Sequence, residues 1–197
     1  MRRKKLLCAL LLLTLALPTA LAEGFVFDGA ITWTATPQDA LDYLEGCEIY
    51  DEDMGDYGVL TVVDRDGGKC LGFDCGRAAF MYYDGELFAI YAYFTEESLG
   101  GDMQALADRL SEDYGEPNPE RAAMTLGDLL NGVSGNSRQT VLVWTPDENT
   151  TIELHDTGII QNDDGSAYPW MGSLIITNTR TSIEFDRALE GYLDVED

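Results

Sequence analysis

Residues 78–94 read AAFMYYDGELFAIYAYF, which is two apolar runs separated by Asp84-Gly85. Asp-Gly between two such runs is one of the strongest short-range signals for a β-hairpin with a two-residue turn. The sequence therefore predicts strands over Ala78–Tyr83 and Glu86–Phe94. A two-residue turn also predicts the register: Tyr83 pairs with Glu86, and each step back along the first strand matches one step forward along the second.

This register gives the hairpin two faces of different chemistry. One face holds Ala79, Met81, Phe88, Ile90, Ala92 and Phe94, and the other holds Phe80, Tyr82, Leu87, Ala89, Tyr91 and Tyr93. The first face is almost free of groups that need a hydrogen-bond partner, so we expect it to lie in the core beneath the helices.

The second face carries the amphipathic aromatic side chains in which binding interfaces are rich. The candidate binding residues are Tyr82, Tyr91, Tyr93 and Phe80. They would contact an unknown protein or a small ligand. The alternative is that a loop from the second half of the chain, such as Asn118–Asn136, covers this face.

Helices are predicted on either side of the hairpin. Thr36 is expected to cap the first helix, with Pro37 in its first turn, Asp39 completing a capping box and Gly46 ending it. Apolar side chains recur at helical spacing from Asp102 to Tyr114. Further helices are expected over Thr125–Val133 and over the tail, Ser182–Leu193, where Ile183, Ala188 and Leu189 would face inward.

The predicted order of elements indicates an α+β fold. Besides the hairpin, strands are expected around Ile31 and Trp33 and over Val59–Val63, Thr140–Thr145, Thr150–Asp156 and Leu174–Thr179, with a polar loop at Asn162–Ser166. Strands joined by short hairpins must be antiparallel. We therefore expect an antiparallel sheet of about six to seven strands with helices on one face, in two helix-plus-three-strand half-repeats.

The amino terminus has the pattern of a signal peptide. Four basic residues precede the apolar run Leu6–Leu17, and Ala20-Leu21-Ala22 offers small residues at the cleavage positions. Residues 1–22 are therefore predicted to be removed, so that a secreted, extracytoplasmic protein begins at Glu23. The apolar run is too short to span a bilayer, and we expect no membrane insertion after cleavage.

Residues 23–197 are expected to form a single acidic domain, because no linker-like segment divides them. The whole chain has 36 acidic and 12 basic residues, a formal charge of −24. Without the signal peptide, eight basic residues oppose the same 36 acidic ones, which gives −28. Such a field repels nucleic acid and anionic membranes.

Cysteines and acidic loops leave alternatives open. Cys47, Cys70 and Cys75 are an odd number in the mature chain, so a Cys70–Cys75 disulfide and three partly buried thiols are both compatible with export. The acidic stretches Asp51–Asp56 and Asn162–Gly165 are either weak calcium sites or solvated loops. Neither stretch has the spacing of an EF-hand, and no other cofactor is indicated.

Catalytic signals are sparse. His155 is the only histidine, and strand alternation places it beside Glu153 on a face that we expect to be solvated. The chain has no Gly-x-Ser-x-Gly elbow and no phosphate-binding glycine loop. These features favour an exported, non-enzymatic binding or interaction domain. The alternative is an extracellular hydrolase with an acidic site that matches no known pattern.

Three short motifs carry a resemblance to known proteins: Ile31-Thr32-Trp33, Asp84-Gly85-Glu86-Leu87, and the helix end from Leu110 through Tyr114-Gly115 to Pro117. The combination resembles small exported proteins of Gram-positive gut bacteria. At the level of architecture it is similar to the β-lactamase-inhibitor-protein fold and to small outer-membrane assembly lipoproteins, although the lipid-anchor cysteine of the latter is missing. Both are binding modules, so the resemblance implies binding rather than catalysis.

Overall fold

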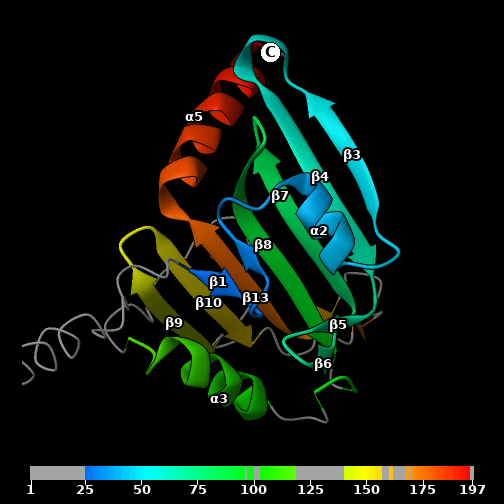
Figure 1. The fold of residues 1–197 in the computed structure, drawn as a ribbon, viewed down its shortest axis with the longest axis vertical. Coiled ribbons are helices and arrows are strands. Elements are labelled where there is room, and N and C mark those ends of the chain that lie inside the picture. Colours follow the sequence, from blue (N-terminus) through cyan, green and yellow to red (C-terminus); the bar gives the residue numbers. More distant parts are fainter. Residues whose placement is uncertain are drawn as a thin grey trace, which may run out of the picture.

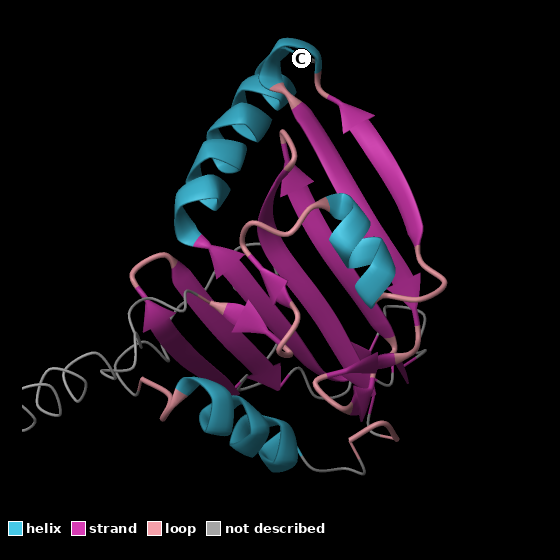
Figure 2. Cartoon of the chain, viewed as in Figure 1, coloured by secondary structure: helices cyan, strands magenta, loops and turns pink. Residues whose placement is uncertain are grey.

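The computed structural model describes residues 25–95, 97–99, 103–118, 140–156, 160–161, 167–168 and 170–195. Its centre is a seven-stranded antiparallel sheet with the spatial order β3-β4-β7-β8-β13-β10-β9 (Figures 1 and 2). In chain order these strands are β3 (Glu48–Asp53), β4 (Val59–Asp66), β7 (Arg77–Tyr83), β8 (Glu86–Thr95), β9 (Thr140–Asp147), β10 (Thr150–Asp156) and β13 (Trp170–Asn178).

Short ribbons and helices complete the described fold. The ribbons pair β1 (Val26–Phe27) with β2 (Ile31–Thr32), β5 (Lys69–Cys70) with β6 (Phe73–Asp74), and β11 (Ile160–Gln161) with β12 (Ala167–Tyr168). The helices are α2 (Pro37–Tyr43), the 3-10 turn η1 (Gly55–Tyr57), α3 (Met103–Tyr114) and α5 (Thr179–Val195). The antiparallel α+β class predicted from the sequence is confirmed.

The two halves of the sheet are unequal, which corrects the expected three-plus-three arrangement. Four sheet strands follow α2 and three follow α3, and the last strand of each half, β8 and β13, pair side by side. The additional strand is β3, where we expected an acidic loop. Every residue of β3 is exposed. An edge strand with both faces in water has no apolar alternation, so its sequence resembles a loop.

The entry to α2 is the capping box that the sequence predicts. The Thr36 hydroxyl accepts a hydrogen bond from the Asp39 backbone N–H (3.3 Å), and Asp39 Oδ2 accepts one from the Thr36 backbone N–H (2.7 Å). Pro37 lies where its missing N–H costs nothing. The cap therefore fixes the start of the helix that carries Ala40 into the core.

The register of the β7–β8 hairpin differs from our expectation by one residue. Tyr83 opposes Glu86 and Tyr82 opposes Leu87, as the two-residue turn requires, but Met81 opposes Ala89 instead of Phe88. Phe88 is thus the extra residue of a β-bulge. Beyond the bulge, every residue of β8 is shifted by one position relative to β7. Because neighbouring residues of a strand point to opposite faces, the residues of β8 after Phe88 lie on the other face from the one predicted.

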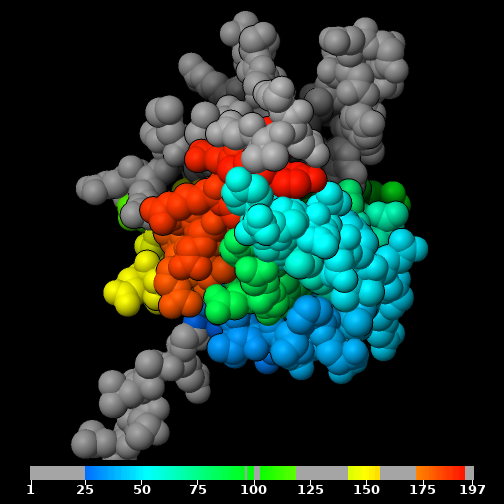
Figure 3. All heavy atoms as spheres, turned by 90° about the horizontal axis from the view of Figure 1, so that it is seen from above, coloured from blue at the N-terminus to red at the C-terminus, as the bar shows by residue number. Residues whose placement is uncertain are grey.

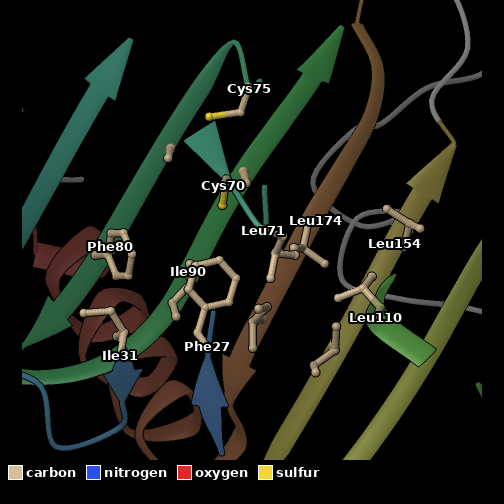
Figure 4. Close-up of a cluster of buried hydrophobic side chains, with 14 of the residues drawn as sticks. Phe27, Ile31, Cys70, Leu71, Cys75, Phe80, Ile90, Leu110, Leu154 and Leu174 are labelled. Carbon is tan, nitrogen blue, oxygen red and sulfur yellow. The ribbon is translucent and has the colours of Figure 1, made fainter. Parts of the chain in front are cut away.

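One face of the sheet, which we call the front face, carries the larger core. Figure 4 shows Phe80 and Ile90 beside Phe27 and Ile31 of the β1–β2 ribbon, and Leu154 beside Leu110 of α3. Leu174 of β13 belongs to the same cluster. Helix α2 adds Ala40 and Leu44, and α3 adds Leu106, Ala107 and Leu110. Helices α2 and α3 both cover this face.

Helix α5 packs on the other face, which we call the back face, so the expectation that helices cover one face is wrong. Phe185 of α5 stacks on Phe88 (ring centroids 4.7 Å apart) and meets the edge of Tyr83. Its carboxyl end, red in Figure 3, adjoins the cyan segment that contains η1. A Cβ on Gly191 would come 2.5 Å from the Tyr57 ring. Phe88 lies on this face beside Met81 and Tyr83, and the ring of Phe185 covers it. Ile183, expected to face inward, is 46% exposed.

Several sequence-based expectations lie outside the described residues. These are the signal peptide, the helix at Thr125–Val133, the polar loop at Asn162–Ser166 and the covering loop at Asn118–Asn136 beyond its first residue. No helix among the described residues is long and apolar enough to cross a membrane.

Cys47, Cys70 and Cys75 are free thiols, and burial raises the pKa of Cys70 and of Cys75.

Candidate functional site

A cleft of about 560 Å³ opens between the β1–β2 ribbon, the end of α3 and the β9–β10 turn. Three separate segments of the chain form its wall. The lining residues are Phe25, Val26, Asp28, Gly29, Arg109, Asp113, Tyr114, Pro146 and Asp147. The cleft therefore combines aromatic rings, three carboxylates and one guanidinium.

Asp28 is held in place by the turn that joins β1 to β2. Its backbone adopts φ of 49°, and the turn is closed by a hydrogen bond from the Ala30 N–H to the Phe27 carbonyl (3.0 Å). Asp28 Oδ2 accepts hydrogen bonds from the Tyr43 hydroxyl (2.7 Å) and from the Leu71 backbone N–H (3.3 Å). An aspartate tolerates this left-handed conformation better than most residues. The carboxylate is therefore fixed by α2 and by the β5–β6 ribbon.

Asp147 is fixed by the tight turn between β9 and β10. Its Oδ1 accepts a hydrogen bond from the Asn149 backbone N–H and its Oδ2 accepts one from the Thr150 hydroxyl, both at 2.8 Å. The Thr150 hydroxyl in turn accepts a hydrogen bond from the Trp33 indole N–H (2.9 Å). A relay of hydrogen bonds thus connects this carboxylate to the segment after β2.

The aromatic part of the wall is a stack of rings. Phe25 lies between Trp33, with ring centroids 4.6 Å apart, and Tyr114, with ring centroids 5.9 Å apart. The Tyr114 hydroxyl donates a hydrogen bond to the Val26 carbonyl (2.9 Å). Burial raises the pKa of Tyr114, so this side chain is neutral at physiological pH. It presents an uncharged ring to the cleft.

Arg109 is the single cationic side chain of the lining. It forms ion pairs with Asp113 and Glu112, one turn further along α3. The hydrogen bond to Asp113 raises the pKa of Arg109, so its charge is permanent. Because this charge is already paired on its own helix, the carboxylates of Asp28 and Asp147 leave the cleft with a negative excess.

The acidic groups of the described residues are not arranged for a metal ion. No group of three or more histidine, cysteine, aspartate or glutamate side chains there lies close enough to hold one. Residues 51–53, part of one proposed calcium loop, lie in β3, where alternate carboxylates point to opposite faces. The other stretch, Asn162–Gly165, lies outside the described residues, and calcium binding stays a prediction.

The four predicted binding residues do not share a face. Phe80 and Tyr82 lie on the front face and are completely buried, and the Tyr82 hydroxyl donates a hydrogen bond to the Thr36 carbonyl (3.0 Å). The expectation that their face is exposed is therefore wrong for these two residues. The bulge at Phe88 is the physical reason, because it places Phe80 opposite Ile90, inside the core.

Tyr91 and Tyr93 lie on the back face beside α5, and both are partly buried. Burial, followed by the nearby Tyr93 hydroxyl and the carboxylates of Asp186 and Glu153, raises the pKa of Tyr91. Across β8, β13 and β10, Tyr93 opposes Ser173, which opposes His155. The tyrosines thus adjoin a polar row on the sheet.

His155 belongs to this polar row and is 3% exposed, so the expected solvated position is wrong. Its Nε2 lies 3.0 Å from Glu153 Oε2, which confirms the predicted neighbour. We expected this face of the strand to be exposed to solvent because Glu153 and His155 are both polar. His155 can be buried because Glu153 Oε2 is a hydrogen-bond partner for its ring nitrogen.

The cleft residues gave little signal in the sequence. Asp28-Gly29 and Asp147-Glu148-Asn149 are ordinary turn sequences, and Arg109 and Asp113 form an ordinary ion pair on a helix surface. Asp-Gly between Phe27 and Ile31 could have indicated a second tight turn. Nothing local indicates that these segments meet.

Comparison with known proteins adds no assignment: the chain matches no family model, no curated protein and no solved structure at a significant level.

Proposed function

We propose that this protein is an exported domain that binds a ligand without transforming it, and that the ligand site is the cleft between the β1–β2 ribbon, α3 and the β9–β10 turn. The observation that carries the proposal is the convergence of Phe25, Tyr114 and fixed carboxylates on one hollow of about 560 Å³. Ligand sites are typically concave, with apolar walls and a few polar groups that are held in place.

Pre-organisation of the walls supports binding. Asp28 and Asp147 each accept two hydrogen bonds, and Tyr114 is tied to the Val26 carbonyl. Side chains that are already ordered lose little conformational freedom when a ligand arrives. The resemblance to binding modules such as the β-lactamase-inhibitor-protein fold points in the same direction.

The position of His155 supports a function without catalysis. It is the only histidine of the chain, and it lies on the back face of the sheet, whereas Phe25 and Tyr114 of the cleft pack with the front-face core. The cleft therefore has no side chain of the type that most often performs general acid–base catalysis near neutral pH.

One observation favours the alternative, a hydrolase. Ser173 is the register partner of His155 on the neighbouring strand, and His155 contacts Glu153. A hydroxyl, a base and an orienting carboxylate are the parts of a nucleophilic site. However, Ser173 and His155 are both buried. We therefore expect no labelling of the protein by a fluorophosphonate probe. Labelling that disappears in Ser173→Ala would establish the hydrolase instead.

The binding proposal is tested by a chemically diverse fragment library, screened against the mature protein by two-dimensional NMR. Pro146→Trp fills the cleft with a large side chain, and Glu148→Trp places the same side chain on the neighbouring exposed turn as a matched control. Fragments that shift resonances of the cleft residues should be lost from Pro146→Trp and kept by Glu148→Trp. Absence of cleft binders from the library, or equal binding by both variants, would contradict the proposal.

A further inference from the structure

We infer that the ligand of this cleft is an organic cation: an ammonium or guanidinium group carried on a short hydrocarbon stem. The inference rests on the proposed function and specifies the chemical class of the ligand. Three features of the lining support it, namely the balance of charge, the aromatic stack and the separation of the carboxylates.

The balance of charge in the lining is negative. Asp28, Asp113 and Asp147 face a single guanidinium, that of Arg109. Arg109 is engaged by Asp113 and Glu112, so the charge that remains for a ligand is that of Asp28 and Asp147. The formal charge of the whole chain, −24, adds a field of the same sign. Such a field attracts cations and repels anions.

The aromatic stack suits a cation that carries hydrocarbon. The rings of Phe25 and Tyr114 line the same hollow as the carboxylates, and Val26 and Pro146 add apolar surface. The faces of Phe25 are occupied by Trp33 and Tyr114, so a bound ammonium or guanidinium group meets the quadrupole of the Tyr114 ring. Methylene groups of the ligand pack against the edge of Phe25. A ligand without hydrocarbon groups would make no apolar contact with this part of the lining.

The separation of the carboxylates favours an extended cation over a metal ion. Asp28 comes from the β1–β2 turn, Asp113 from α3 and Asp147 from the β9–β10 turn. No three acidic side chains of the described residues lie close enough together to hold one metal ion. A guanidinium or a chain with amino groups reaches carboxylates that are too far apart to share a single ion.

Binding is measured by calorimetry on the mature protein with a series of probes of equal length. 1-Aminopentane and 1,5-diaminopentane carry the cation, pentan-1-ol is the neutral match and pentanoate is the anionic match. We expect the amines to bind at least tenfold more tightly than the alcohol and pentanoate not to bind. Raising the salt concentration should weaken the amines and leave the alcohol unchanged.

Single substitutions test whether the amines bind in the cleft and whether a change in its charge raises or lowers their affinity. Asp147→Asn should weaken amine binding about tenfold, whereas Asp42→Asn, on the exposed surface of α2 outside the cleft, should not change it. Arg109→Gln removes the one positive charge and should strengthen amine binding severalfold. An anion site would respond to Arg109→Gln in the opposite direction. If Asp147→Asn fails to fold, the probe series and Arg109→Gln still decide the question.

The basic group can belong to a free amine or to a lysine side chain of a peptide. Nα-acetyl-lysine methylamide, compared with 1-aminopentane, identifies which source fits better, and a preference in either direction supports the shared chemistry. Equal or tighter binding of pentan-1-ol or pentanoate in the cleft would overturn the inference and leave the proposed function standing. Failure of every probe and of the fragment library would overturn both.

Discussion

Phe80 of β7 faces Ile90 of β8, and both side chains lie in the front-face core. A regular hairpin with the Asp84-Gly85 turn would have placed Ala89 opposite Phe80. The one-residue difference arises at Phe88, which leaves the ladder and turns its ring to Phe185 of α5. This bulge places Phe94 in the front-face core and turns Tyr91 to the back face, where it packs near α5.

The first prediction follows from the position of Phe80. Phe80→Ala should lower the free energy of unfolding by about 3–5 kcal/mol, because it removes a completely buried ring from the core. The measurement is urea unfolding followed by circular dichroism. Tyr50→Ala on edge strand β3, where the ring is 51% exposed, is the control and should change stability by less than about 0.5 kcal/mol. Similar losses from both would mean that the Phe80 ring is not part of the core.

The second prediction concerns the cover of the back face. Phe185→Ala should destabilise the protein by about 3 kcal/mol or more, since its ring contacts both Phe88 and Tyr83. Ile183→Ala on the same helix removes an exposed side chain and should cost less than about 0.5 kcal/mol. Thermal and urea unfolding of the two variants distinguish them. A larger effect from Ile183 would indicate that α5 packs through its other side.

The third prediction is the pH dependence of the α2 cap. Hydrogen bonds from the Thr36 backbone N–H and hydroxyl lower the pKa of Asp39 below its ordinary value of 3.8. The stabilising contribution of the ionised carboxylate is therefore complete above that ordinary value, and it is lost as the pH falls through the lower folded-state pKa. NMR titration of the Asp39 carboxyl should give a midpoint below 3.8. In Thr36→Ala the midpoint should rise, and an unchanged midpoint would refute the capping role.

The fourth prediction concerns the contact between His155 and Glu153 on the back face. His155→Ala should cost about 1–3 kcal/mol of stability, because it leaves the Glu153 carboxylate without its partner at 3.0 Å. Glu153→Ala and the double variant complete a double-mutant cycle. We expect a coupling energy of at least about 0.5 kcal/mol between the two side chains. Additive losses would show that the contact contributes nothing to stability.

The fifth prediction concerns export. N-terminal sequencing of the protein collected from the culture medium should begin at Glu23, because Ala20-Leu21-Ala22 provides the small residues that a signal peptidase requires. Replacement of Ala20 and Ala22 with arginine should block processing. Secreted protein that retains Met1 would contradict the expectation.

Local sequence was sufficient for several features of this protein. Thr36, Pro37 and Asp39 predicted the start of α2, and Asp84-Gly85 predicted the hairpin turn. The helical stripe through Leu106 and Leu110 predicted α3. Each of these features depends on residues within a few positions of one another, and its hydrogen bonds or spacing can be read from the sequence directly.

Tertiary structure alone decided the remaining features. The ring of Phe88 stacks on Phe185, from the far end of the chain, and β3 is a strand because β4 supplies its backbone partners. The cleft brings Asp28, Asp113 and Asp147 together from three segments whose distance in space depends on the register of the whole sheet. Sequence patterns report the environment of neighbouring residues, whereas the positions of these carboxylates follow from packing between elements. For that reason the cleft could not be located from the sequence, and its position came from the tertiary structure.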